Sequence, residues 1–292
     1  MTSVRVRQAV QASTEALQSS LLVDPFGWPQ YLPRREGDAP GLCGTSYGLM
    51  AMSLAEGILD RTLLTARERR GIGATVWGKM DVRGGFIVDA HFPIPTYDAC
   101  WESIIDLLLV GESATSDSML TAIDYVLRGQ LDGGGWPVSD TMTSIHDFTT
   151  AQMLEILVIF RGSDSASIGE RVQAGIQAAT TCLLSSQHSE GYWVLGGSPS
   201  LAITARCVLA LKFASALTPD AARRALSWMS VHFSAASQDE FECVKLWGPD
   251  YSVQINSPRV YRYSHCTRAL AVLAIVELHK DSGGYEDFER WV

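Results

Sequence analysis

The chain has 292 residues, of which 47% are hydrophobic and 19% are charged. This composition is typical of an ordered globular protein with a filled interior, and it excludes a disordered or low-complexity chain. The formal net charge is −9, which argues against a nucleic-acid-binding surface, because phosphate binding needs a concentrated basic face.

The N-terminal residues and the cysteines indicate a compartment. The stretch MTSVRVRQ has no apolar core of the kind found in signal peptides, and the longest apolar run, Ala269–Val276, is far too short to span a membrane. Six cysteines are scattered without a CxxC pair, which favours reduced thiols. We therefore expect a cytoplasmic protein without a transmembrane segment, for which a peripheral contact with a membrane is left open.

Helical patterns of two kinds alternate along the chain. The first kind is amphipathic, with its charges on one side, and is expected to face water. The second kind is apolar on most faces, as buried helices are. In chain order the amphipathic segments are Arg5–Leu22, Thr65–Lys79, Ser116–Arg128, Ser167–Ser185, Pro219–Ala235 and Tyr285–Val292, and the apolar segments are Gly44–Leu59, Tyr97–Val110, Asp147–Arg161, Leu201–Ala214 and His265–His279.

A turn motif recurs between these segments. Gln130–Trp136 and Gln187–Trp193 share the pattern QxxxGxW, and their tryptophans are 57 residues apart (193 − 136). In each copy the glycine permits the positive φ that ends a helix, and the tryptophan is a packing anchor. Weaker copies place aromatic anchors at Trp28, Phe86 and Trp247. Self-similarity at a nearly constant spacing is the signature of a repeat architecture.

The length of the repeat predicts the architecture. Consecutive anchors are 50 to 58 residues apart, whereas open solenoids of helix pairs repeat every ~33–47 residues. We therefore expect an all-α fold, an α/α toroid (double α-barrel) of about five to six helical hairpins, in a single domain over residues 1–292. An irregular helical domain is the alternative.

The motif resembles the QW motif of squalene–hopene cyclases, other class II terpenoid cyclases and protein prenyltransferase β-subunits. Tyr125 and Val126, ahead of Gln130, match the aromatic–aliphatic pair that precedes the motif in that family. The resemblance implies a central cavity that binds a small hydrophobic partner, an isoprenoid substrate, and acid-initiated cyclisation or isomerisation. Because a fold does not define a reaction, a non-catalytic toroid that binds a lipid or a partner protein is the alternative.

The family's proton donor is an aspartic acid in a DxDD motif, and the corresponding stretch here is His146–Ala151. The motif is broken, because His, Phe and Thr stand where three Asp are expected and Asp147 lies at the variable position. The resemblance makes Asp147 the candidate proton donor, with His146 as its orienting partner. The alternative is that Asp147 is the N-cap of the helix that follows.

A second candidate group lies at the start of another apolar segment. Asp98 and Glu102 are four residues apart, so both carboxylates share one helix face. They are candidates for an acid site or for Mg²⁺ bound with a diphosphate, and the alternative is enrichment of acids at a helix N-terminus. Tyr97 and Trp101 beside them are candidates for stabilising cations through their π-faces.

Further substrate-binding candidates are Thr150 and His265, which lie at the starts of apolar segments, and two arginines. Arg206 and Arg268 interrupt otherwise apolar helices. A buried arginine needs a partner, so each is expected to meet an acid or to anchor an anionic group of the ligand. A diphosphate clamp and a structural ion pair are both open.

The prenyltransferase resemblance also implies a zinc site near the C-terminus. Cys243 and His265 are the candidate ligands, with Asp239 or Glu242 as a third. In the other interpretation Cys243 is a buried thiol and His265 caps a helix. We therefore expect no cofactor, and Mg²⁺ or Zn²⁺ is the alternative to that expectation. No motif specifies the chain length of the substrate, the presence of a diphosphate or the oligomeric state.

Overall fold

The computed structural model describes residues 4–29, 37, 39–88, 93–162, 166–195, 197–235 and 271–278. The chain divides into two compact units, Met1–Arg128 and Gly129–Val292, and each is described by itself. The single domain expected over residues 1–292 stays a prediction. Within the described ranges, no helix is both long and apolar enough to cross a membrane.

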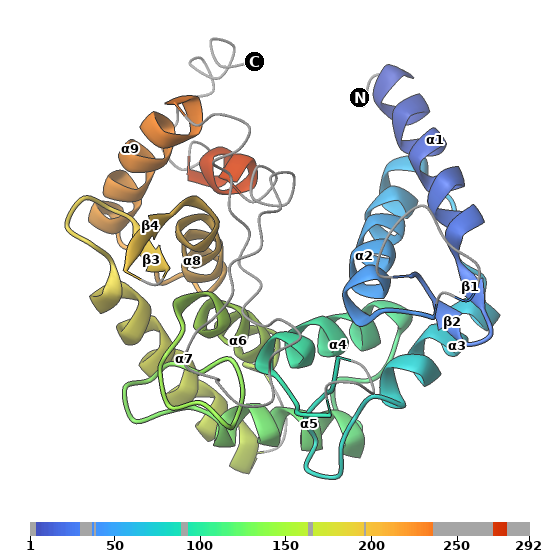
Figure 1. Ribbon diagram of the computed structural model, residues 1–292, viewed down its shortest axis with the longest axis horizontal. Helices are drawn as coiled ribbons and strands as arrows, with labels where there is room; N and C mark the ends of the chain where they lie inside the picture. Colours follow the sequence, from blue (N-terminus) through green and yellow to red (C-terminus); the bar gives the residue numbers. More distant parts are fainter. Residues whose placement is uncertain are drawn as a thin grey trace. The chain divides into compact units, whose positions relative to one another are not determined.

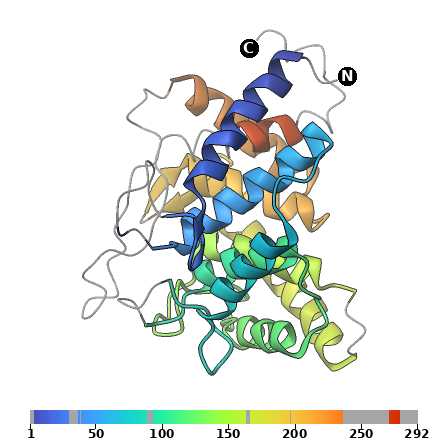
Figure 2. The same cartoon turned by 90° about the vertical axis from the view of Figure 1, so that its right-hand side faces the viewer.

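The first unit is built from helix pairs (Figure 1). Helices α2 and α4 pack against each other, α1 lies against α2, and α3 and α5 lie against α4. The contact of α1 with α2 can be followed in both views (Figure 1 and Figure 2). The elements are α1 (Val4–Ser20), β1 (Leu22–Val23), β2 (Phe26–Gly27), α2 (Leu42–Leu59), α3 (Ala66–Trp77), α4 (Tyr97–Val110) and α5 (Asp117–Arg128), with β1 and β2 paired antiparallel.

The second unit repeats this construction. Helices α6 and α8 pack against each other, α7 covers both of them, and α9 covers α8. The elements are α6 (Asp147–Ile159), α7 (Ala166–Ser186), β3 (Trp193–Leu195), β4 (Ser198–Ser200), α8 (Leu201–Phe213) and α9 (Pro219–Ala235), with β3 and β4 paired antiparallel, and residues 271–278 are also helical.

The two kinds of helix differ in burial as their composition predicts. In α8 nearly every side chain from Leu201 to Leu211 is buried, whereas α5 buries one face, which includes Met119, Ile123 and Val126. We call α2, α4, α6 and α8 the core helices and α1, α3, α5, α7 and α9 the cover helices. The all-α class expected from the sequence is confirmed.

The aromatic anchors Trp28, Phe86, Trp136 and Trp193 are fully buried, whereas Trp247 lies outside the described residues. They tie each turn to the next core helix. The backbone N–H of each of the three described anchor tryptophans donates a hydrogen bond to a threonine hydroxyl one turn into that helix. The pairs are Trp28 with Thr45 (3.1 Å), Trp136 with Thr150 (3.0 Å) and Trp193 with Thr204 (2.9 Å). These threonines are therefore structural parts of the repeat, including Thr150, which the sequence had suggested for substrate binding.

The glutamines of the motif tie each turn to the next cover helix. Gln130 Nε2 donates to the carbonyls of Gly134 (2.7 Å) in its own turn and Gly175 (3.0 Å) in α7. The glycine at the end of the turn has a positive φ of 85°, and a Cβ there would lie 2.5 Å from the Ala178 carbonyl oxygen. The turn thus lies so close to α7 at Gly134 that a residue with a side chain would not fit there.

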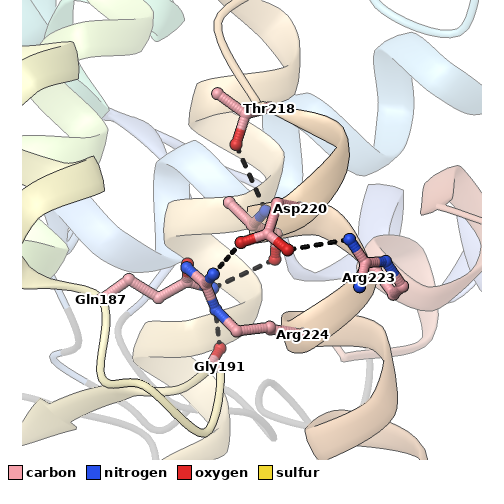
Figure 3. Close-up of polar contacts among 7 residues, drawn as sticks. Gln187, Gly191, Thr218, Asp220, Arg223 and Arg224 are labelled. Carbon is pink, nitrogen blue, oxygen red and sulfur yellow. Dashed lines mark hydrogen bonds and ion pairs between the residues drawn. The ribbon is translucent and has the colours of Figure 1, made fainter.

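The second copy makes the same contacts at the start of α9 (Figure 3). Gln187 Nε2 donates to the carbonyls of Gly191 and Ala221, at 3.1 Å each. Its Oε1 accepts from Arg224 Nη2 (2.6 Å), and Arg224 is also paired with Asp220. The motif therefore works as a hydrogen-bonded joint between successive hairpins.

Candidate functional site

The start of α6 differs from the starts of the other core helices. In each of the four repeats that the structure describes, the N-cap residue pairs with the aromatic anchor through the backbone, and the His146 N–H donates to the Trp136 carbonyl (2.8 Å). In α4 and α8 the side chain of the N-cap residue also accepts a hydrogen bond from the third residue of the helix, whereas Gly41 of α2 has no side chain to do so. At this position α2, α4 and α8 carry Gly41, Thr96 and Ser200.

His146 is therefore the N-cap of α6. Its Nδ1 accepts a hydrogen bond from the Thr149 backbone N–H (3.3 Å). The alternative that Asp147 caps the helix is wrong, because Asp147 is the first residue inside α6. The equivalent residues of the other core helices are Leu42, Tyr97 and Leu201, so the repeat itself does not require a carboxylate at this position.

The His146 ring is neutral. Because Nδ1 accepts a hydrogen bond, the ring proton is assigned to Nε2. Nε2 is buried and has no hydrogen-bond partner among the described residues. Burial lowers the pKa of His146 to about 4. At neutral pH the histidine thus puts no positive charge next to Asp147.

The Asp147 carboxyl lies at the end of the cover helix α7. Its Oδ1 is 3.1 Å from the hydroxyl of Ser186, the last residue of that helix. Burial raises the pKa of Asp147 to about 6, and the hydrogen bond from Ser186 acts in the opposite direction. The carboxyl thus holds its proton at a pH where an ordinary aspartate is ionised.

Two thiols belong to the surroundings of Asp147. Cys207 in α8 donates weakly from Sγ to the Asp147 backbone carbonyl (3.9 Å). Burial and the charge of Asp147 raise the pKa of Cys182 to about 11, and the same two causes raise the pKa of Cys207. Both cysteines are buried and free. They stay uncharged at neutral pH, so they place no charge beside the Asp147 carboxyl.

Arg206 in α8 is part of an ion pair with the neighbouring core helix. Its Nη2 lies 2.6 Å from Glu155 Oε2 in α6, and its guanidinium lies 5.8 Å from the centre of the Phe148 ring. The structural ion pair, one of the two alternatives for Arg206, is present. The sequence did not single out Glu155.

The other candidate group belongs to the first unit and lies on α4. Tyr97 is 1% exposed, and its ring stacks on Tyr125 with the ring centres 5.5 Å apart. Trp101 and Glu102 are also buried, whereas Asp98 is half-buried. The ring of Tyr97 thus packs in the interior of its own unit.

Asp106 continues the row of acids on the same face of α4 and was missed from the sequence. It is fully buried, and its Oδ2 accepts a hydrogen bond from Ser46 Oγ in α2 (2.7 Å). Burial raises the pKa of Asp106 well above its usual range. The available signal was the i, i+4, i+8 spacing of Asp98, Glu102 and Asp106.

The zinc candidates Cys243 and His265, with Asp239 or Glu242, lie outside the described residues, as does Arg268. Their roles stay predictions. Among the side chains that the structure describes, no three His, Cys, Asp or Glu residues come together as a metal site would require.

This arrangement of helical hairpins is the α/α toroid of the type II terpene cyclases, so the fold class expected from the sequence is confirmed. Type II terpene cyclase MstE from Scytonema, in complex with geranylgeranyl dihydroxybenzoate (substrate), matches with a TM-score of 0.62 at 16% identity. The match covers 96% of this chain and 84% of that one. MstE in complex with merosterolic acid A (product) matches with a TM-score of 0.62 at 15% identity, over 95% and 84% of the two chains.

A third match is ent-copalyl diphosphate synthase from Streptomyces platensis, with a TM-score of 0.59 at 16% identity. It covers 92% of this chain, which spans 46% of the synthase, less than half its length. No protein-family model and no curated protein sequence matches the chain. At these identities the likeness establishes the fold.

Proposed function

We propose that the protein binds an apolar isoprenoid and catalyses its acid-initiated cyclisation or isomerisation, with Asp147 as the proton donor. The observation that carries the proposal is the environment of Asp147, a carboxyl whose pKa is raised to about 6 at the head of a core helix. The similar MstE structures contain an isoprenoid-derived substrate and its product, which supports the substrate class.

The proposed reaction begins with transfer of the Asp147 carboxyl proton to one carbon of an alkene. The π electrons of the alkene form the new C–H bond, and the neighbouring carbon becomes a cation. A second alkene attacks this cation and closes a ring. The last cation gives a proton to water, which completes the reaction. The substrate thus gains one proton and loses one, so substrate and product are isomers.

The raised pKa decides how much of the donor is available. At pH 6 a carboxyl with a pKa of about 6 is about half protonated, whereas one with a pKa of 3.8 is less than about one per cent protonated. A positive charge beside the acid would lower its pKa. His146 has a pKa of about 4 and does not supply such a charge. Its proposed role is to orient Asp147 through the cap that fixes the start of α6.

The remaining candidates have secondary roles in this proposal. Arg206 is already paired with Glu155, so anchoring an anionic group would require it to exchange partners. Tyr97 and Trp101 lie in the first unit with Asp98 and Glu102, and their roles as cation stabilisers or as a second acid site stay proposals. The reaction written above requires neither a diphosphate nor a metal ion.

The test is incubation of the purified protein with linear isoprenoids, with and without a diphosphate, and analysis of the products by mass spectrometry. Asp147→Asn should reduce product formation at least about a hundredfold, the usual contribution of a general acid. Asp117→Asn is the matched control, because Asp117 is the exposed first residue of α5. Wild-type activity should fall as the pH rises above about 6, because Asp147 then loses its proton.

Three outcomes would decide against this proposal. Unchanged product from Asp147→Asn would remove Asp147 from the mechanism. Saturable binding of the isoprenoid without any product would instead support a non-catalytic binding protein. Zinc in stoichiometric amount that is lost in Cys243→Ala would support the prenyltransferase-like alternative.

A further inference from the structure

Ser186 has a hydroxyl with two neighbours and a single proton. Its Oγ lies 3.1 Å from Asp147 Oδ1 and 3.2 Å from the Leu183 carbonyl oxygen one turn earlier in α7. A serine hydroxyl donates one hydrogen bond and accepts up to two. A full hydrogen bond from Ser186 therefore goes to one of these two oxygens at a time.

The choice of acceptor depends on the proton of Asp147. When Asp147 is ionised, its Oδ1 can only accept, so the Ser186 hydroxyl donates to it. When Asp147 is protonated, its own O–H donates to Ser186 Oγ, and the Ser186 proton turns to the Leu183 carbonyl. In both states Ser186 Oγ and Asp147 Oδ1 share a hydrogen bond, the Leu183 carbonyl keeps the hydrogen bond that it accepts from Trp193 Nε1 (2.8 Å), and no heavy atom has to move.

The difference in solvent exposure between Ser186 and Asp147 indicates from which side a proton can reach the carboxyl. Ser186 is exposed at the end of α7, whereas Asp147 is half-buried. The hydroxyl thus lies between water and the carboxyl. An acid that gives its proton to an apolar substrate has to recover one from solvent before the next turnover.

We propose that Ser186 is a positioning residue that holds the Asp147 carboxyl in both protonation states and returns a proton to it from solvent. The proposal rests on the proposed function of Asp147. In the returning step hydronium gives a proton to Ser186 Oγ, and the hydroxyl's former proton passes to Asp147 Oδ1. Serine is restored, hydronium becomes water, and the carboxylate becomes a carboxylic acid.

The chain offers a closely matched control at the neighbouring residue. Ser185 is exposed in the same turn of α7, and its hydroxyl donates to the Cys182 carbonyl (2.9 Å) in the manner of Ser186 and Leu183. It differs in that this hydrogen bond involves no carboxyl. Three variants therefore separate the contact with Asp147 from other effects of a substitution at the end of α7. They are Ser186→Ala, Ser185→Ala and Ser186→Thr, which restores the hydroxyl.

The first measurement is the titration of Asp147, followed by carbon-13 NMR of its carboxyl. In Ser186→Ala the pKa of Asp147 should rise further, because its ionised form loses a hydrogen bond. In Ser185→Ala and Ser186→Thr the pKa should stay close to that of the wild type. An unchanged pKa in Ser186→Ala would overturn the holding role, and this result does not depend on any enzymatic activity.

The second measurement compares the first turnover with later ones. Enzyme equilibrated below pH 6 carries the Asp147 proton, so Ser186→Ala should complete a single turnover at the wild-type rate. Its steady-state rate should fall about tenfold, the equivalent of one hydrogen bond, and Ser186→Thr should restore it. An equal loss in both phases would overturn the returning step. Absence of turnover in the wild type would overturn the proposed function, while the titration would still decide the holding role.

Discussion

His146 combines a hydrogen bond that caps a helix with a ring that burial keeps neutral. In the folded protein its pKa is lowered to about 4 from the ordinary value of 6.5. Between these two values the unfolded chain binds a proton that the folded chain does not. The free energy of unfolding therefore decreases as the pH falls from 6.5 towards 4, and the contribution is fully present above 6.5.

Two substitutions separate the cap from the ring. His146→Ala removes the acceptor of the Thr149 N–H and should lower the free energy of unfolding at pH 7.5 by about 1 kcal/mol. His146→Ser keeps an acceptor, as Ser200 does at the start of α8, and should stay close to the wild type. Both variants should lose the histidine's contribution to the pH dependence between 6.5 and 4. Urea unfolding at a series of pH values measures both effects.

An equal loss in the two variants would contradict this division of roles, because it would show that packing of the imidazole outweighs the cap. Product formation by the same two variants, His146→Ala and His146→Ser, is a second test. If His146 acts only by fixing the start of α6, His146→Ser should retain most of the product formation that Asp147→Asn abolishes. A large loss in His146→Ser with unchanged stability would assign the ring a direct part in the reaction.

At the level of elements, the Ser46–Asp106 hydrogen bond joins α2 to α4 inside the first unit. Burial favours the neutral form of Asp106 and raises its pKa well above 3.8. Between 3.8 and the folded pKa, the folded state binds more protons than the unfolded state. This carboxyl therefore lowers the free energy of unfolding progressively as the pH rises through that window.

Asp106→Asn tests this contact, since the amide has the shape of the acid without its charge. Its oxygen can accept from Ser46 at every pH. The variant should gain stability relative to the wild type as the pH rises from 4 to 8, and the two should converge at the acid end. Asp117→Asn, at an exposed site in the same unit, should show no such trend. Parallel stability curves for Asp106→Asn and the wild type would contradict the protonated state.

The helices and turns of the repeat were predictable because each is encoded by local sequence. Apolar content on most faces identified core helices such as α4 (Tyr97–Val110), and QxxxGxW identified the joints. The alternative that makes Asp147 the cap of α6 is one residue too late, because Asp is a common N-cap and His is not. Only the recurring backbone pairing with Trp136 revealed His146 in that position.

The surroundings of Asp147 were not predictable in the same way. Ser186 and Cys207 lie 39 and 60 residues further along the chain. Periodicity shows which face of a helix is apolar, but it does not show which residue of a second helix lies opposite a given side chain. Asp147 was identified from the resemblance to a family, whereas Ser186 and Cys207 were identified only from the packing of α7 and α8 against α6.

On the scale of the whole molecule, the proposed function predicts a ligand that is apolar along most of its length. The toroid matches MstE over 96% of this chain, and that structure holds a geranylgeranyl-containing substrate. Hydrophobic surface taken from water stabilises a complex roughly in proportion to its area. A ligand that binds the folded chain alone then raises the melting temperature by mass action.

Geranylgeraniol and geranylgeranyl diphosphate share one chain and differ in the head group. Each should raise Tm by about 5 °C or more at a hundredfold excess over its Kd, because such binding adds about 2.7 kcal/mol to the stability of the folded state. Inorganic diphosphate alone should leave Tm unchanged, since the burial of the apolar chain provides the binding energy. Asp147→Asn should keep the full shift in both cases, because binding precedes proton transfer and does not require it. A shift produced by diphosphate alone would point to an anion site, and a shift lost in Asp147→Asn would make the carboxyl a binding group.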